Sequence, residues 1–171
     1  MAAACLLAFG TACSGSVFED SESVVERARS EATEGLREEL DELRERTSAL
    51  VSEGGLAELT SRSASGGWFG TARVGSSDVD WQKSSDGILV NLADDGAELS
   101  ADGVLFYRVP FTEFAGGAGT VTAGTCYRLT ANEATVLFDD RDCPEEFTAR
   151  LNNSDDGFLV LVSELIENAD D

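Results

Sequence analysis

The side chains that could do chemistry in this chain are carboxylates and cysteines, because the sequence has no histidine. This excludes the commonest general base, the usual catalytic triads and most zinc sites. Two carboxylates can still hydrolyse a glycosidic bond, one as the acid and the other as base or nucleophile. Candidate pairs by proximity are Asp78 with Asp80 and Asp139 with Asp140. The alternative for both pairs is a solvated turn, since catalytic carboxylates need burial.

Other catalytic and metal-binding patterns are weak in this sequence. No Walker loop, GxSxG elbow or HExxH motif occurs. Two acidic stretches, 91–102 and 152–163, loosely follow a calcium-binding EF-hand loop. Ala93 stands at the third position of the first stretch, and Ser163 replaces the bidentate glutamate of the second. We therefore expect no catalytic residue, no metal site and no cofactor.

The charge of the chain is strongly negative. Asp and Glu total 33 against 12 Lys and Arg, which gives a formal net charge of −21. A surface this acidic repels phosphate backbones, so nucleic acid is excluded as a partner class. Hydrophobic residues make up 42% of the chain, which is enough for a packed core and is not typical of a disordered protein.

The N-terminus combines a short apolar run with a cysteine. Residues 1–12 carry no charged side chain, and the run is too short to span a bilayer, which takes about 20 apolar residues. Gly10-Thr11-Ala12 leads into Cys13, and Ser-Gly-Ser follows. This pattern resembles the lipobox of bacterial lipoproteins. The resemblance implies cleavage before Cys13 and a diacylglyceryl group on its thiol, which would anchor the protein to the extracytoplasmic face of the cell membrane.

The predicted signal peptide, 1–12, lacks the basic residues that usually begin such a segment. We therefore expect the natural start to lie upstream, so that this leader is truncated. Residues 13–22 would contain the lipidated cysteine and a polar tether, because they are rich in serine and acidic residues. The alternative is an apolar N-terminus that packs inside a cytosolic fold.

The export prediction also bears on the four cysteines. Cys5 would leave with the leader and Cys13 would be acylated, which leaves Cys126 and Cys143 as an even pair. Exported compartments permit disulfides, so we predict a bond between Cys126 and Cys143. Closing this loop stabilises the fold by about 3 kcal/mol in the chain-entropy model. The spacing does not fit a CxxC redox motif or a zinc knuckle. The alternative is two buried free thiols.

A helical stem is predicted over residues 23–60, because apolar residues recur there every three or four positions. Two alternatives follow from this pattern. One is a coiled-coil stalk that gives a homodimer through residues 36–50, and the other is an amphipathic helix packed on its own domain. The clean heptad seam covers barely two heptads, which favours the second alternative. Gly54-Gly55 should end the main helix, and 56–59 should add one turn.

The rest of the chain is predicted as a linker over 61–67 and a β-rich globular head over 68–171. Short β-rich runs alternate there with Gly, Asp and Asn clusters, which is typical of an antiparallel sheet. Hairpin turns are predicted at 94–96 and 131–133. Pro110 should end its strand or place that strand at a sheet edge. The expected strands are 68–74, 79–82, 88–93, 104–109, 120–123, 126–129 and 135–138.

Two elements are predicted near the C-terminus. One short helix should span 145–151. The last apolar run, 158–166, fits one helical face, although its first five residues fit a buried strand equally well, and we favour the helix. The predicted fold is therefore α+β, with a long N-terminal amphipathic helix followed by a mainly antiparallel β domain with a C-terminal helix.

A second resemblance concerns the head. Cys-Tyr-Arg-Leu-Thr at 126–130, followed by Cys143-Pro144, is similar to a C-Y-R-x-T…C-P pattern in uncharacterised exported proteins of high-GC Gram-positive bacteria. The resemblance implies export and the disulfide, and no activity. We therefore predict a non-catalytic, lipid-anchored binding or scaffolding module whose partner is an envelope protein or a cell-wall ligand. The alternative is a carboxylate-dependent hydrolase of cell-wall carbohydrate.

Overall fold

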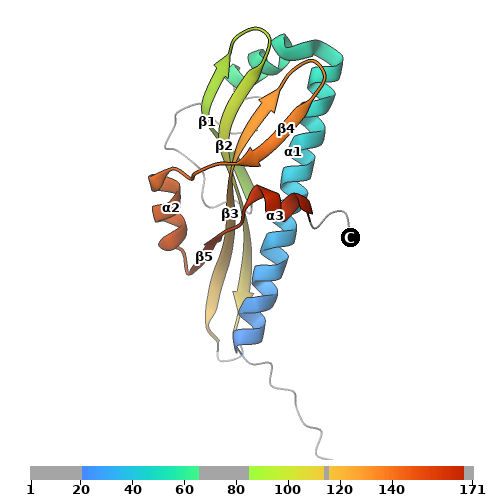
Figure 1. The fold of residues 1–171 in the computed structure, drawn as a ribbon. Helices are drawn as coiled ribbons and strands as arrows, with labels where there is room; N and C mark the ends of the chain where they lie inside the picture. The colour runs from blue at the N-terminus through green and yellow to red at the C-terminus, as the bar shows by residue number, and fades with distance from the viewer. Residues whose placement is uncertain (1–20, 66–84, 114–115, 168–171) are drawn as a thin grey trace, which may run out of the picture.

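The computed structural model describes residues 21–65, 85–113 and 116–167. It contains a long N-terminal helix, a mainly antiparallel sheet and two short helices (Figure 1), which confirms the predicted α+β fold class. Cys13, the leader and the strands predicted at 68–74 and 79–82 lie outside the described residues.

Within the described residues the sheet has five strands, and helices pack on both of its faces. β1 to β4 follow one another in antiparallel order, and β5 pairs in parallel with β3. The elements are α1 (Ser21–Ser65), β1 (Ser85–Asp94), β2 (Leu99–Thr112), β3 (Ala118–Ala131), β4 (Val136–Asp140), α2 (Glu145–Asn152), β5 (Asp156–Leu159) and α3 (Val162–Glu167).

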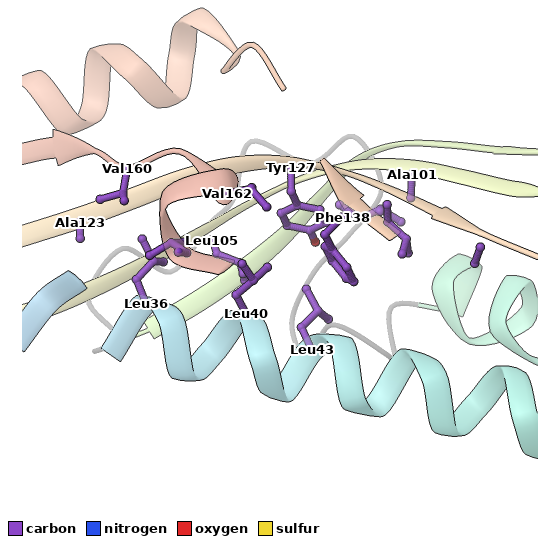
Figure 2. Close-up of a cluster of buried hydrophobic side chains, with 14 of the residues drawn as sticks. Leu36, Leu40, Leu43, Ala101, Leu105, Ala123, Tyr127, Phe138, Val160 and Val162 are labelled. Carbon is purple, nitrogen blue, oxygen red and sulfur yellow. The ribbon is translucent and has the colours of Figure 1, made fainter. Parts of the chain in front are cut away.

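The apolar stripe of α1 packs along one face of this sheet, which we call the α1 face. Leu36, Leu40 and Leu43 point from the helix toward Leu105, Tyr127 and neighbouring strand residues (Figure 2). The second alternative for the helix is therefore the observed one. The helix shares a core with the sheet and is not a separate stem. The seam 36–50, which the first alternative would use for a homodimer, is buried within the chain itself. The buried stripe of α1 is Ala28, Ala32, Leu36, Leu40, Leu43, Thr47 and Val51.

A glycine breaks α1 near its C-terminal end. Gly55 has φ 68° and ψ −174°, a left-handed conformation that glycine adopts without strain. The helix then resumes at Leu56 and runs to Ser65, so the predicted extra turn is longer than expected and the linker does not begin at residue 61. The change of direction brings Leu59 into the core, where it is fully buried.

The predicted hairpin turns connect the strands as expected. In the turn between β1 and β2, Asp94 and Asp95 accept hydrogen bonds from the backbone N–H groups of Gly96 and Ala97. In the turn between β3 and β4, the Asn132 side chain accepts hydrogen bonds from the backbone N–H groups of Ala134 and Thr135. These short polar side chains supply acceptors for backbone N–H groups that have no backbone acceptor in the turn.

Two strands differ from their predicted lengths. The runs 120–123 and 126–129 belong to one strand, β3, because β2 pairs with it without interruption from 118 to 131. Pro110 lies inside β2, which continues to Thr112, and it pairs with Thr120 of β3. Because β2 lies between β1 and β3, the prediction that Pro110 would end its strand or place it at a sheet edge is wrong.

A bulge in β1 keeps its apolar residues on one face. The register shifts between Leu89, opposite Gly103, and Asn91, opposite Asp102. Leu89 and Leu92 are three residues apart, which would place them on opposite faces of a regular strand. With the extra residue both belong to the core of the α1 face.

The C-terminal segment divides into two elements. β5 covers the first part of the run predicted as one helix, and α3 covers the second part. The helix prediction is thus wrong for 158–159 and correct from 162 onward. β5 forms a strand because an edge of β3 is free there, since β4 pairs only with 127–131. Arg29 of α1 contacts β5 through a bidentate ion pair with Asp156.

Candidate functional site

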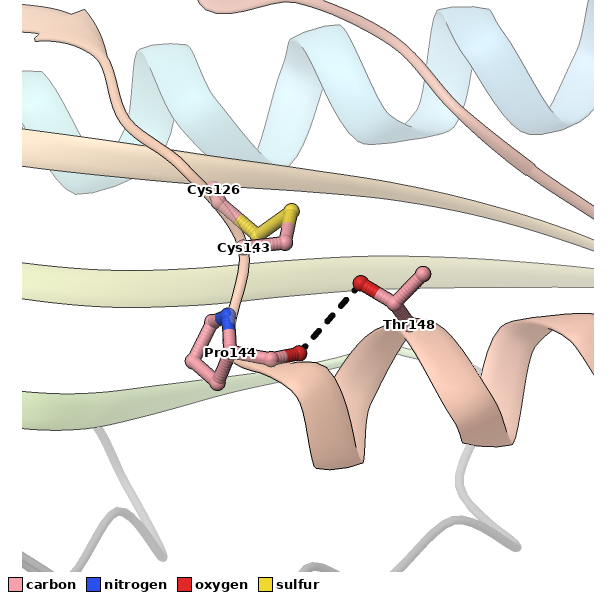
Figure 3. Close-up of a disulfide and its surroundings, with 4 residues drawn as sticks. All are labelled: Cys126, Cys143, Pro144 and Thr148. Atoms are coloured by element: carbon pink, nitrogen blue, oxygen red, sulfur yellow. Dashed lines mark hydrogen bonds between the residues drawn. A yellow bond between two sulfur atoms is a disulfide. The ribbon is translucent and has the colours of Figure 1, made fainter.

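The disulfide between Cys126 and Cys143 is present, as predicted, with Cα atoms 5.3 Å apart. It joins β3 to the chain that enters α2 through Pro144 (Figure 3). The bond lies on the sheet face opposite α1, which we call the α2 face. It therefore fixes the start of α2 against the sheet.

A small second core lies beside this disulfide. Cys126 packs with Phe106 of β2 and with Phe147 and Leu151 of α2. Gly124 makes room for the helix, because a Cβ there would lie 2.8 Å from the Phe147 ring and 2.9 Å from a Leu151 methyl group. α2 thus covers the middle of the face and leaves the end near the β1–β2 and β3–β4 turns uncovered by any described helix (Figure 1).

The uncovered end of the α2 face carries a row of polar side chains, one from each of the strands β1 to β4. In register these are Asn91 of β1, Asp102 of β2, Arg128 of β3 and Asp139 of β4. Side chains that are directly opposite in adjacent strands lie close together on the same face. We call these four residues the polar row.

Asp102 is the centre of an ion cluster within this row. Its Oδ1 and Oδ2 accept hydrogen bonds from Arg128 Nε at 2.8 Å and Nη2 at 3.1 Å. Arg141, which follows β4, brings its Nε to 3.4 Å from the same Oδ1. The hydrogen bond from Arg128 outweighs burial and, with the charges of both arginines, lowers the pKa of Asp102. Asp102 is therefore held as a carboxylate and is unsuited to be a general acid.

An exposed aliphatic side chain lies beside the polar row. Leu137 of β4 is 55% exposed and lies opposite Thr130 of β3. This pair is two residues along each strand from Asp139 and Arg128, and so lies on the same face. The open part of the α2 face therefore combines guanidinium, carboxylate, hydroxyl and amide groups with the exposed side chain of Leu137. Such a mixture suits binding more than chemistry, because protein-binding patches often place arginine beside apolar anchors.

The carboxylate pair at Asp139 and Asp140 does not form a hydrolase site. Neighbouring residues of a strand point to opposite faces. Asp139 belongs to the polar row, whereas Asp140 accepts hydrogen bonds from the backbone N–H and Oγ of Ser163 at the start of α3. The other candidate pair, Asp78 and Asp80, lies outside the described residues.

The remaining described surfaces offer no stronger site. Across residues 21–65, 85–113 and 116–167, no three Asp, Glu or Cys side chains gather so as to hold a metal ion. A shallow hollow on the outer side of α1 is lined by Asp41, Arg44, Glu45 and Ser48. In the same part of the chain, no helix has a stretch apolar and long enough to cross a bilayer.

Comparisons with known proteins find no match among protein-family models, curated proteins or solved structures. Sequence reasoning did not single out Arg128, Arg141 and Asp102 as a group. Arg128 lies 26 positions after Asp102 and 13 positions before Arg141, and only the strand register brings the three together.

Proposed function

We propose that this protein is a non-catalytic, lipid-anchored binding or scaffolding module on the extracytoplasmic face of the cell membrane. Its binding surface would be the open part of the α2 face, and its partner an envelope protein or a cell-wall ligand. The observation that carries the binding role is the polar row with Leu137 exposed beside it. A rigid sheet presents these side chains with little loss of conformational freedom on binding.

Two features support the anchored location. Gly10-Thr11-Ala12-Cys13 supplies an acceptor cysteine at the end of an apolar leader. The Cys126–Cys143 disulfide is the kind of bond that persists in oxidising compartments outside the cytosol. A lipid on Cys13 would leave only seven residues between the anchored cysteine and the start of α1 at Ser21.

The anchor is tested by the intact mass of the native protein taken from the membrane fraction, before and after reduction and alkylation. We expect a lipidated mass that begins at Cys13, with two thiols released only on reduction. The variant Cys13→Ala should lose the lipid mass and leave the membrane fraction, whereas Cys5→Ala should keep both. An unprocessed mass with free thiols would contradict the export, the lipid and the location together.

A further inference from the structure

We propose that Arg128 and Arg141, held over Asp102, form a binding site for an oxyanion, that is, a carboxylate or phosphate group of the ligand. This inference deepens the proposed function, because it rests on the open α2 face being the binding surface. It does not depend on the lipid anchor.

The two arginines have more hydrogen-bond donors than Asp102 uses. Each guanidinium group has five N–H donors in a planar fork, which matches the two oxygens of a carboxylate or phosphate. Arg128 gives Nε and one N–H of Nη2 to Asp102, and Arg141 approaches it through Nε alone. The other N–H groups of both arginines have no hydrogen-bond acceptor within the described ranges. With side chains 39% and 44% exposed, these donors are open to a ligand.

Asp102 contacts two arginines at once. Two cations share the single carboxylate of Asp102. The ion pairs Arg29–Asp156 and Arg46–Glu42, in contrast, match one cation with one carboxylate. Asp102 therefore orients both guanidinium groups toward one place on the face. Counted with Asp139, the row has as many carboxylates as cations, so the site offers an anion the unused N–H donors of two aligned arginines and no net positive charge.

Asp139, Thr130 and Leu137 lie next to Arg128 in the register of β3 and β4. Asp139 lies opposite Arg128 in register and is the carboxylate that would compete with a ligand. It is exposed and forms no ion pair with either arginine. Thr130 and Leu137, the next pair along the strands, add a hydroxyl and an aliphatic contact for the part of the ligand that carries the anion. The site therefore fits an acidic group on a larger molecule.

The test titrates acetate and inorganic phosphate separately into the full chain, with chloride adjusted to constant ionic strength. NMR follows the Nε–Hε resonances of the arginines. We expect saturable shifts at Arg128 and Arg141, and binding about fivefold weaker in Arg141→Gln. The control Arg46→Gln removes an arginine on α1 that is more exposed than Arg141 and pairs with one carboxylate, and it should leave binding unchanged. The absence of saturable shifts, or an equal loss in the control, would overturn the site.

A second variant separates binding from structure. Asp102→Asn keeps the shape of the side chain but removes the competing charge, so an oxyanion should bind about fivefold more tightly than in the wild type. If the arginines serve only to hold the sheet together, this variant gains no affinity and the proposal fails. Acetate and phosphate titrations also tell which oxyanion the site prefers. Anion binding by a protein without a lipidated mass would support this site and contradict the anchor. A lipidated mass without anion binding would support the anchor and contradict this site.

Discussion

The two faces of the sheet are built differently. The α1 face is covered along its length by a helix that begins at Ser21, and its core is apolar from Ala28 to Leu59. The α2 face has a small core under one eight-residue helix, a disulfide at the start of that helix and an open polar end.

The difference between the two faces suggests a different role for each: the α1 face stabilises the fold, and the α2 face is the proposed binding surface. A long apolar interface can carry most of the stability of a domain, because stabilisation grows with the apolar area removed from water. Because the α1 face buries most of the apolar area, the α2 face can expose arginine, carboxylate and leucine side chains while the domain stays folded. The polar row lies on the latter face, which is why we assign binding to it.

The largest expected effect is on the α1 face. Leu40 is 1% exposed, so Leu40→Ala should lower the free energy of unfolding by about 2–5 kcal/mol, because it removes buried methyl groups and leaves a cavity. Leu161 is 53% exposed, and Leu161→Ala should change stability by less than about 0.5 kcal/mol. Chemical denaturation measures both. A midpoint that varies with protein concentration would indicate a homodimer instead of a self-contained core.

The next effect is on the covalent link of the α2 face. Replacing both Cys126 and Cys143 by alanine should cost about 3 kcal/mol, because the unfolded chain regains the freedom of a 17-residue loop. Reduction of the wild type should shift the denaturation midpoint in the same direction. Unchanged stability in the double variant would mean that packing of Phe147 and Leu151 alone holds α2, and the contrast between the faces would weaken.

The smallest effect is the pH dependence of the polar row. The pKa of Asp102 is lowered in the folded state, so its contribution is complete above the unfolded pKa, about 3.9, and is lost as pH falls through the folded value. Because the partners are partly exposed, this contribution should be about 1 kcal/mol or less. Denaturation of the wild type and of Asp102→Asn at pH 7 and pH 3 measures it. The stability difference between the two proteins should shrink at pH 3, and an equal difference at both values would contradict the ion cluster.

The elements with a local signal were predictable. The 3.6-residue stripe of α1, the Asp-Asp-Gly turn at 94–96 and the helix after Pro144 depend on neighbouring residues, so periodicity and turn chemistry suffice to find them. The C-terminal run was harder, because Phe158 and Leu159 fit a strand and a helix equally well. Their conformation is decided by the free edge of β3, which is distant in sequence.

By itself, the sequence determined the fold class, the apolar stripe of α1 and the pairing of Cys126 with Cys143. Each depends on residue type and short spacing. The tertiary structure alone decided that α1 covers its own sheet, that β5 joins β3 in parallel, and that Asp102 meets Arg128 and Arg141. Those contacts join residues far apart in the chain, and strand register and a bulge set them, because a shift of one residue would turn every side chain to the other face.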